Sequence, residues 1–410
     1  MPDGRSSSPE TKKPLIYLNN AATSWPKPPG VIAAIQQSLS LPVFGSGRTT
    51  GTQGEDYISL AREKIAAFLG AEPPEHIVFS AHATDSLNIL ISGFIQKFYT
   101  EQQTSGSDSG CHVLTTALDH NSVLRPLHEL KKRHSSSGFQ LEIISFDDQC
   151  SIRPEMIEAA IRPDTRLMVL SHGSNVLGSL QDIHSIGKIL HDHGIFFIVD
   201  GAQTAGHIKI NLSDLPVDAF VFTGHKALLG LPGTGGFYLR DPERIAPVRF
   251  GGTGTSSFSL DHPPEMPERF EIGTQNYPGL AALAAGVAFI EEKGLSAIEE
   301  QSMRQTSFII RELCKEPNIT IYNKHPDLPV IAFNINGLAN DDVGFILARG
   351  YNIIARTGLH CAPLVHNEID GGKGCVRLSL SVFTTDEECR VAAEAIREIA
   401  RHANRPVSTA

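Results

Sequence analysis

SHGSNVLG at residues 171–178, FFIVDGAQTAGH at 196–207 and AFVFTGHKALLG at 219–230 decide the fold of this chain. An apolar run precedes the first segment and begins the other two. Small and polar residues follow each run. Apolar runs without polar alternation are typical of strands that are buried on both faces of a parallel sheet. Ligands of such sheets bind just beyond the carboxyl ends of the strands. We therefore expect the polar residues after the three runs to form one site.

The residues that follow the three runs are two amides, a carboxylate, an imidazole and a lysine: Asn175, Gln203, Asp200, His225 and Lys226. Pyridoxal phosphate requires a lysine that forms a Schiff base and an acidic partner for its pyridinium nitrogen. Taken alone, Asp200 is better explained as a turn or capping residue and Lys226 as a solvated surface group. Their joint occurrence at strand ends favours a pyridoxal-phosphate site.

Apolar runs alternate with amphipathic helical patterns over most of the first three hundred residues. Strands are predicted at 76–80, 112–117, 141–146, 167–171, 196–200, 219–222 and 236–239. Helices between them are predicted at 121–133, 153–161 and 182–193. This alternation indicates an α/β fold in which helices cover both faces of a mostly parallel sheet.

A different pattern begins near residue 292 and predicts a smaller α+β domain. Its expected helices are 295–313, 341–348 and 386–402, and its expected strands are 330–335, 351–355 and 374–380. We therefore divide the chain into a large domain at 28–292 and a small domain made of 15–27 and 293–410. Residues 1–14 are predicted to be a mobile tail.

Composition and charge indicate a globular protein and exclude several partners. The 410 residues are 41% hydrophobic and 20% charged, which is ordinary for a soluble protein. A net charge of −10 and a pI near 5.9 argue against nucleic acid or a membrane surface as a partner. The N-terminus lacks the apolar core of a secretory signal, and no run reaches the roughly 18 apolar residues of a membrane span. We therefore expect a cytoplasmic protein.

Two further strand ends carry residues suited to a phosphorylated ring. A helix is predicted to begin near Thr84, whose hydroxyl is a good N-cap, and free N–H groups at a helix start bind phosphate. For this segment alone, a capped helix is the better explanation. His120 follows the strand at 112–117, and its ring could stack on a planar cofactor, although a lone histidine there is more often structural.

One of the six cysteines stands in a cationic stretch of sequence. Cys361 lies in ARTGLHCAPLVH with Arg356, His360 and His366, and such neighbours favour a reactive thiolate. An inert buried thiol is the better explanation for four of the others: Cys111, Cys314, Cys375 and Cys389. No CxxC pair and no Cys/His group with zinc spacing occurs, so no metal site is predicted.

Several segments resemble, in the same order, those of one enzyme family. SHGSNVLG, VDGAQ and TGHK are similar to the class V, fold-type I pyridoxal-phosphate enzymes, above all to the branch of cysteine desulfurases and selenocysteine lyases. YLNNAAT, FSAHATDSLN, DHNS, FEIGTQN and RTGLHCAPL resemble that branch as well. The resemblance covers roughly residues 17–400. The short RTGxHCA form resembles the SUF-type, group II desulfurases.

The resemblance implies roles for the residues at the strand ends. Lys226 would bind the cofactor as a Schiff base and later move the Cα proton of the substrate. Asp200 would keep the pyridine nitrogen protonated, and His120 would stack on the ring. Asn175 and Gln203 would bond the phenolic oxygen.

The resemblance also implies separate groups for the phosphate and the substrate. The phosphate would be held by Ala83, Thr84, Thr223 and His225, and by Thr274 of the neighbouring subunit in a homodimer. Arg377 would bind the substrate α-carboxylate, because a guanidinium suits that bidentate contact. Arg356 and Asn175 are further candidates near the substrate.

In the desulfurase branch, the cysteine that matches Cys361 attacks the substrate sulfur. We therefore expect conversion of L-cysteine to L-alanine with sulfur transferred to Cys361 as a persulfide, and a sulfur-acceptor protein as a candidate partner. The alternatives are a selenocysteine lyase, a class V C–S lyase or aminotransferase-like enzyme that does not use Cys361, and a sulfur-carrier binding scaffold. The intact Lys226, Asp200 and His120 argue against the scaffold.

The sequence departs from the family pattern at three places, two of which, around His82 and Arg48, concern the choice of substrate. His82 stands where the family usually has glycine, and Thr384 stands where it usually has asparagine. The stretch GSGRTTGTQGED at 45–56, which contains Arg48, lacks the histidines of many relatives. None of these changes touches the lysine, aspartate and histidine of the expected cofactor site.

Overall fold

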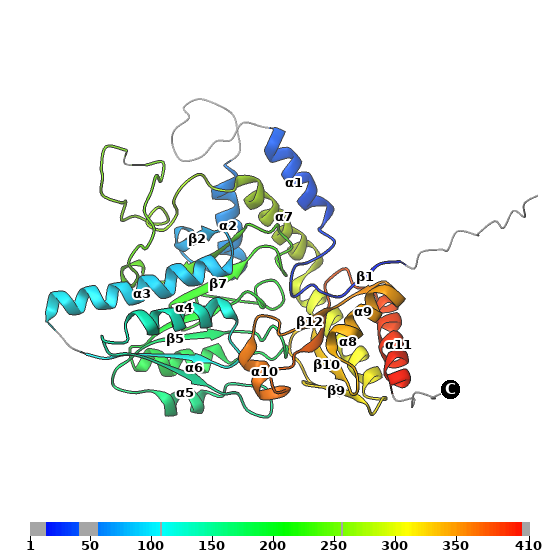
Figure 1. The fold of residues 1–410 in the computed structure, drawn as a ribbon. Coiled ribbons are helices and arrows are strands. Elements are labelled where there is room, and N and C mark those ends of the chain that lie inside the picture. The colour runs from blue at the N-terminus through cyan, green and yellow to red at the C-terminus, as the bar shows by residue number, and fades with distance from the viewer. Residues whose placement is uncertain (1–13, 41–55, 107–108, 256, 404–410) are drawn as a thin grey trace, which may run out of the picture.

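A computed structural model describes residues 14–40, 56–106, 109–255 and 257–403 (Figure 1). Two main sheets organise these residues, a seven-stranded one and a four-stranded one. Of the predicted tail at 1–14, all but residue 14 lies outside the described residues. The departure at 45–56, with Arg48, also lies outside them, apart from Asp56.

The large sheet is parallel except for one strand. Its order is β2 (Ile77–Ser80), β8 (Gly235–Leu239), β7 (Ala219–Thr223), β6 (Phe196–Asp200), β5 (Thr165–Ser171), β3 (Cys111–Thr116) and β4 (Phe139–Ile144). β8 pairs in antiparallel fashion with β2 and with β7, and the other neighbours are parallel. The prediction of a mostly parallel sheet is confirmed.

Alternate residues of the central strands enter two separate hydrophobic cores. In β5, Met168 and Leu170 face one core while Leu167 and Val169 face the other, because successive side chains of a strand point to opposite faces. One core is closed by α3 (Ala83–Ser105) and α4 (Asn121–Arg133). The other is closed by α2 (Tyr57–Leu69), α5 (Pro154–Ala160), α6 (Ile183–Asp192) and α7 (Tyr277–Lys293), and α1 (Pro29–Ser40) packs on α7. No described helix has both the length and the apolar character to cross a membrane.

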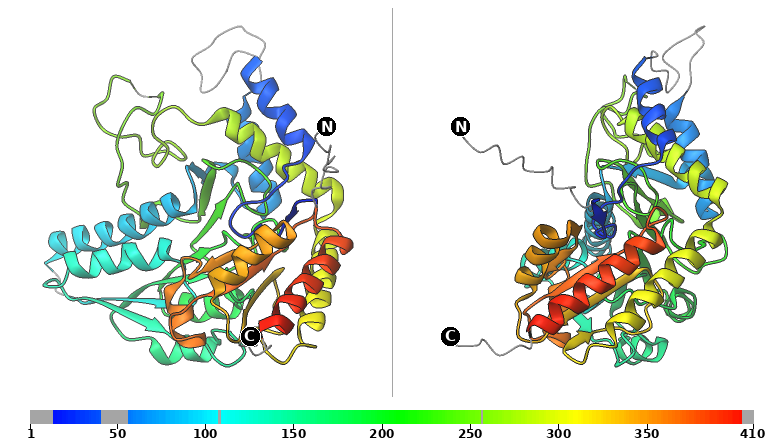
Figure 2. Two further views of the ribbon diagram at one scale, coloured as in Figure 1. Left: turned by 45° about the vertical axis from the view of Figure 1, so that its right-hand side comes forward. Right: turned by 90° about the vertical axis from the view of Figure 1, so that its right-hand side faces the viewer.

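The smaller sheet is antiparallel, in the order β12 (Arg356–Gly358), β13 (Cys375–Ser379), β10 (Val330–Ile335) and β9 (Ile319–Ile321). It shares a core with α8 (Leu295–Leu313), α9 (Asn340–Tyr351) and α11 (Asp386–Ala403), and Figure 2 shows α11 lying along α8. Val376 and Leu378 of β13 face this core. Cys375 and Arg377 therefore lie on the opposite face of β13, toward the large sheet.

The segment before α1 pairs with the smaller half of the molecule. β1 (Ile16–Tyr17) is parallel to β11 (Ile353–Ile354), and Asn20 N donates a hydrogen bond to Ser379 O. α10 (Pro363–Ile369) lies between the two halves in Figure 1. The division into domains at 28–292 and at 15–27 with 293–410 agrees with these pairings and stays a prediction.

Most predicted strands differ from the observed ones by one or two residues at an end, and two need a physical explanation. β4 runs from Phe139 to Ile144 instead of from 141 to 146, because its register follows its single neighbour β3, in which Cys111 is opposite Phe139. The strand predicted at 351–355 is reduced to β11. Asn352, with a φ of 56°, ends α9 in the left-handed conformation, so regular pairing starts only after it.

A buried ion pair fastens α2 to the segment that carries the FEIGTQN motif. Arg62 donates to the two carboxylate oxygens of Glu271 at 2.7 and 3.0 Å, and Phe79 N of β2 donates to the same carboxylate at 2.6 Å. Both charged side chains are about nine-tenths buried. Loss of one partner would leave the other as an uncompensated buried charge, which is strongly destabilising.

Glu271→Ala should lower the free energy of unfolding by about 3–5 kcal/mol, because the Arg62 guanidinium loses its buried anion. Glu129→Ala is the matched control, since Glu129 pairs with Arg133 on the exposed surface of α4 and should matter little. Urea unfolding followed by circular dichroism compares the two variants. Similar losses in both would contradict the importance of the buried pair.

Candidate active site

A cavity of about 210 Å³ lies beyond the carboxyl ends of the parallel strands, where the smaller sheet meets the large one. Eleven of the thirteen residues predicted for the site line it: Ala83, Thr84, His120, Asn175, Asp200, Gln203, Thr223, His225, Lys226, Arg356 and Arg377. Cys361 lines an adjoining cavity, and Thr274 lies elsewhere. The structure thus brings together residues that are up to 294 positions apart, from Ala83 to Arg377.

Lys226 and Asp200 place opposite charges at neighbouring strand ends. Asp200 ends β6, and its Oδ1 accepts a hydrogen bond from Ala202 N at 3.0 Å. Burial raises the pKa of the Asp200 carboxyl. Burial also lowers the pKa of Lys226 to about 8, against the opposing effect of Asp200. A lysine with such a pKa is partly uncharged near neutral pH and can serve as a nucleophile or a base.

Gly201 lets the turn after Asp200 pass close to β7. A Cβ atom at this position would lie 2.0 Å from the ring of Phe220. Because overpacking of this kind forces the backbone to shift, the glycine of the DGAQ motif keeps the Asp200 carboxylate in place.

The turn that carries Lys226 is held from outside by the N-terminal segment. The carbonyl oxygen of His225 accepts hydrogen bonds from Ser24 N at 3.0 Å, Ser24 Oγ at 3.1 Å, Lys27 Nζ at 3.1 Å and Thr23 Oγ1 at 3.3 Å. This contact of Lys27 is not predictable from the sequence, because a lysine in a loop is most often solvated. The segment after YLNNAAT therefore supports the candidate cofactor lysine.

His120 caps α4 and carries an uncharged ring near neutral pH. Its Nδ1 accepts a hydrogen bond from Ser122 N at 3.0 Å and lies 2.8 Å from Ser122 Oγ. Burial lowers the pKa of His120 to about 4, and the nearby charges of Lys226 and Arg356 add to that shift. The His120 ring is therefore uncharged, and Ser122 holds it at Nδ1.

Asp119 fixes the turn before His120 and was not singled out in the sequence. Its buried carboxylate accepts hydrogen bonds from Thr115 Oγ1 at 2.8 Å, Thr116 N at 2.7 Å and Ser171 N at 2.7 Å. These bonds tie the end of β3 to the end of β5. The available signal was an acidic residue directly before the candidate stacking histidine.

The start of α3 differs from the prediction that Thr84 caps the helix. The N-cap is His82, whose Nδ1 accepts a hydrogen bond from Asp85 N at 3.0 Å. Ala83 and Thr84 instead form the first turn, where backbone N–H groups lack partners inside the helix and suit an anion. The imidazole that replaces the family's glycine therefore supplies the cap expected from the threonine.

Arg377 is a buried cation for which none of the ion pairs between described residues supplies an anion. Its Nη1 donates to Asn175 O at 2.8 Å and its Nη2 to Asn19 Oδ1 at 3.3 Å. Its buried Nε has no partner among the described residues. A buried guanidinium is costly without an anionic partner, so this position suits the carboxylate of a bound ligand.

Cys361 stands in a strained turn next to the cavity. His360 and Cys361 have φ values of 49° and 59°, in the left-handed region that costs free energy for residues other than glycine. Asn175 Nδ2 donates to His360 O at 2.7 Å, and Asn121 N donates to Cys361 O at 2.7 Å. The thiol lies 3.7 Å from Arg356 Nη2. Contacts from the large sheet thus hold the turn and its sulfur.

Three of the predicted contacts, those of Gln203, Asn175 and Thr274, involve groups outside this chain. Gln203 lines the cavity, but its Nε2 donates to Ala21 O at 3.1 Å. Thr274 is exposed and lines another cavity beside Glu271. The roles of Gln203 and Asn175 toward a ring oxygen, and of Thr274 toward a neighbouring subunit, stay predictions.

The polar groups of the cavity fit pyridoxal phosphate. Thr223 Oγ1 and His225 Nδ1 are buried at the cavity and have no partner among the described residues. With the first turn of α3, they can bind a phosphate. Asp200 offers an anion to a pyridinium nitrogen and Lys226 offers an amine to an aldehyde.

The chain belongs to the aminotransferase class-V family, whose model matches residues 16–391. This family is dependent on pyridoxal phosphate. A cysteine desulfurase from Cronobacter sakazakii is 31% identical, over 92% of this chain and 91% of that protein. A probable cysteine desulfurase from Halalkalibacterium halodurans is 30% identical, over 94% of this chain and 93% of that protein.

Solved structures support the same relationship. The apo structure of a cysteine desulfurase from Thermococcus onnurineus NA1 is similar with a TM-score of 0.84 and 32% sequence identity, over 95% of both chains. The predicted fold-type I transferase fold and the resemblance to cysteine desulfurases are therefore confirmed. The SUF-type subgroup stays a prediction.

The lowered pKa of Lys226 can be measured in cofactor-free protein by trace labelling with acetic anhydride at several pH values. Only the uncharged amine reacts, so labelling should rise through a midpoint near pH 8, from roughly a tenth of its maximum at pH 7 to nine tenths at pH 9. The exposed Lys131 serves as the internal reference in peptide mass spectrometry. A midpoint for Lys226 above pH 10 would contradict the effect of burial.

Proposed function

We propose that the protein is a pyridoxal-phosphate-dependent cysteine desulfurase that converts L-cysteine to L-alanine and takes up the sulfur on Cys361 as a persulfide. One observation carries this proposal: Lys226, Asp200 and Arg377 line one cavity, and the Cys361 turn is hydrogen-bonded to its wall. The cysteine desulfurases among the relatives, which match more than nine tenths of the chain, support it.

The cofactor, when bound, supplies an electron sink for the pair of electrons released at the substrate Cα. Asp200 would keep a proton on the ring nitrogen, because its buried carboxylate needs a cationic partner. His120, which is uncharged, would pack against the ring. Thr223, His225 and the first turn of α3 would bind the phosphate.

The substrate would be oriented by Arg377 and deprotonated by Lys226. Arg377 has a buried Nε to which no described residue is hydrogen-bonded, so a carboxylate can complete its hydrogen bonds. Lys226 would first hold the cofactor and then, once the substrate has replaced it, accept the Cα proton on Nζ. Its pKa of about 8 lets a useful fraction of the amine be uncharged near neutral pH.

Cys361 would then attack the sulfur of the bound substrate. An S–S bond forms while the Cβ–S bond breaks, so that cysteine and the Cys361 thiol give alanine and a Cys361 persulfide. Arg356, with Nη2 at 3.7 Å from the sulfur, would stabilise the thiolate that attacks. Nucleophilic catalysis of this kind divides one difficult displacement into two easier steps.

Two partners complete the proposal. The persulfide would be passed to a sulfur-acceptor protein, for which the second cavity beside Cys361 provides an approach; Asn121 and Arg125 line this cavity. A homodimer would bring Thr274 to the phosphate of the neighbouring subunit. The exposed position of Thr274, away from the cavity of its own chain, supports this arrangement.

Cys361→Ala should abolish persulfide formation and the turnover of L-cysteine while leaving the cofactor bound. The reason is that the thiol is the sulfur acceptor, whereas it does not belong to the cofactor cavity. Alanine production and protein persulfide are measured with L-cysteine and, in parallel, with L-selenocysteine. Cys314→Ala is the control; the expectation that Cys314 is buried is wrong, because this C-cap residue of α8 is exposed.

Wild-type release of sulfide from L-cysteine by Cys361→Ala would reject the persulfide step. If that variant still releases selenium from L-selenocysteine but no longer turns over L-cysteine, Cys361 serves only the sulfur reaction. A wild-type enzyme that acts only on L-selenocysteine would favour the selenocysteine lyase. Turnover by Lys226→Ala would reject the cofactor assignment as a whole.

Arg377→Lys should raise KM for L-cysteine and lower kcat/KM by roughly 10- to 100-fold, since charged hydrogen bonds are worth about 1.5–3 kcal/mol. The lysine keeps a positive charge but loses the two-pronged contact with a carboxylate. Steady-state kinetics with L-cysteine and with cysteamine, which lacks the carboxylate, separates the two effects. An equal loss for both compounds would show that Arg377 does not bind the carboxylate.

A further inference from the structure

Three buried side chains with metal-binding atoms meet directly behind the Cys361 turn. They are His360 in the turn, His366 on α10 and Cys375 at the start of β13. One potential ligand atom from each lies within 4.8 Å of the other two, and all three side chains are at least 97% buried. None of the roles proposed above uses His366 or Cys375.

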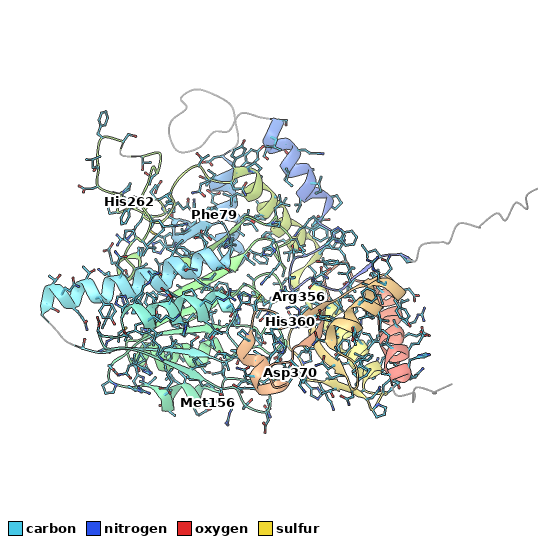
Figure 3. All side chains as sticks on the ribbon, viewed as in Figure 1. Phe79, Met156, His262, Arg356, His360 and Asp370 are labelled. Carbon is cyan, nitrogen blue, oxygen red and sulfur yellow. The ribbon has the colours of Figure 1, made fainter. Side chains whose placement is uncertain are left out.

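A carboxylate orients one of these histidines as it would orient a metal ligand. His366 Nδ1 lies 2.6 Å from Asp370 Oδ2, and Asp370 Oδ1 accepts hydrogen bonds from Lys373 N at 2.9 Å and Gly374 N at 3.2 Å. With its proton on Nδ1, His366 presents an unprotonated Nε2. Ligand histidines are commonly held by carboxylates in this way. Figure 3 labels His360 and Asp370 at the α10 segment between the two sheets.

Within the described part of the chain, no partner accounts for the burial of His366 Nε2. His366 Nε2 is buried and has no hydrogen-bond partner among the described residues. Buried polar atoms are normally paired, so an orphan of this kind calls for an unseen partner. The other groups of the cluster are the His360 imidazole and the Cys375 thiol.

The spacing of the atoms suits a tetrahedral ion. His360 Nε2 and Cys375 Sγ are 3.4 Å apart. Bonds of about 2.0 Å to nitrogen and 2.3 Å to sulfur, at tetrahedral angles, place two such ligands about 3.5 Å apart. The ligand atom of His366 lies within 4.8 Å of those of His360 and Cys375. A shift on the order of 1 Å would bring it to the tetrahedral separation from both.

We propose that His360, His366 and Cys375 form a binding site for one divalent cation of the zinc class, with Asp370 holding His366 in place. Two imidazoles and a thiolate match the ligand preference of zinc, and a fourth position stays open. On binding, the Cys375 thiol releases its proton to solvent and its sulfur bonds to the ion. His360 Nε2, which now lies 3.1 Å from Cys375 O, gives up its proton, and the proton moves to Nδ1, for which the described residues supply no partner.

Such an ion would join the elements around the candidate nucleophile. His360 precedes Cys361 in the strained turn, His366 belongs to the helix after it, and Cys375 belongs to the strand that carries Arg377. The ion would therefore fix the turn that positions the Cys361 sulfur. The residues are six and nine positions apart, unlike the short pairs of zinc fingers, so sequence spacing does not reveal the site.

Titration of chelator-treated holoenzyme with Co²⁺ tests the proposal directly. One equivalent per chain should bind and give sulfur-to-cobalt charge transfer in the near ultraviolet. Cys375→Ser should remove this band, and Asp370→Asn should weaken binding by about 10- to 100-fold, as typical for the loss of a carboxylate behind a ligand. Cys361→Ala and Cys389→Ala should leave the titration unchanged.

X-ray absorption of the zinc-loaded wild type is a second measurement, and it requires no variant. It should show one sulfur at about 2.3 Å and two imidazole nitrogens at about 2.0 Å. Absence of stoichiometric binding would overturn the proposal. The proposal would also be overturned if the cobalt band disappeared in Cys361→Ala but remained in Cys375→Ser. The ion would then be bound by the partly exposed Cys361 thiol.

Discussion

Buried charge at the junction of two sheets is the constraint on which the rest of the site depends. Asp200 and Lys226 lie at neighbouring strand ends of the large sheet, and Arg377 reaches the same cavity from the small one. Isolated buried charges cost several kcal/mol each unless they are compensated. A cofactor with a cationic ring nitrogen compensates Asp200, and its aldehyde reacts with Lys226. The carboxylate of a substrate compensates Arg377. The same burial gives Lys226 a pKa at which its amine can react.

The junction also explains why a cysteine so far along the chain belongs to this site. Two successive residues of the Cys361 turn adopt the left-handed conformation, and hydrogen bonds from Asn175 and Asn121 hold the turn in place. Asn175 lies in the loop after β5 and Asn121 begins α4, so both donors belong to the large half, whereas the turn itself follows β12 of the small sheet. The position of the sulfur therefore depends on the packing of both halves, and the proposed cation behind the turn would act on the same element.

Sequence reasoning was most successful where a single physical rule determines the outcome. Uninterrupted apolar runs predicted the buried strands, and the strand-end rule predicted that residues such as Asn175 and Lys226 meet in one cavity. It was weaker for contacts made through space by common residue types. The sequence predicts Thr84 as the cap of α3 because hydroxyls are frequent caps, whereas the imidazole of His82 fills that role. The hold of Lys27 on the His225 carbonyl could not be inferred, because nothing local distinguishes that lysine from a solvated one.

All of these roles require that the strand ends bind pyridoxal phosphate through Lys226. Borohydride reduction of the purified protein, followed by peptide mass spectrometry, tests it most directly, because reduction makes a bond between cofactor and lysine permanent. We expect a phosphopyridoxyl group on the peptide that contains Lys226 and on no other lysine peptide. An unmodified Lys226 in protein that carries the cofactor, or the group on a different lysine, would contradict it.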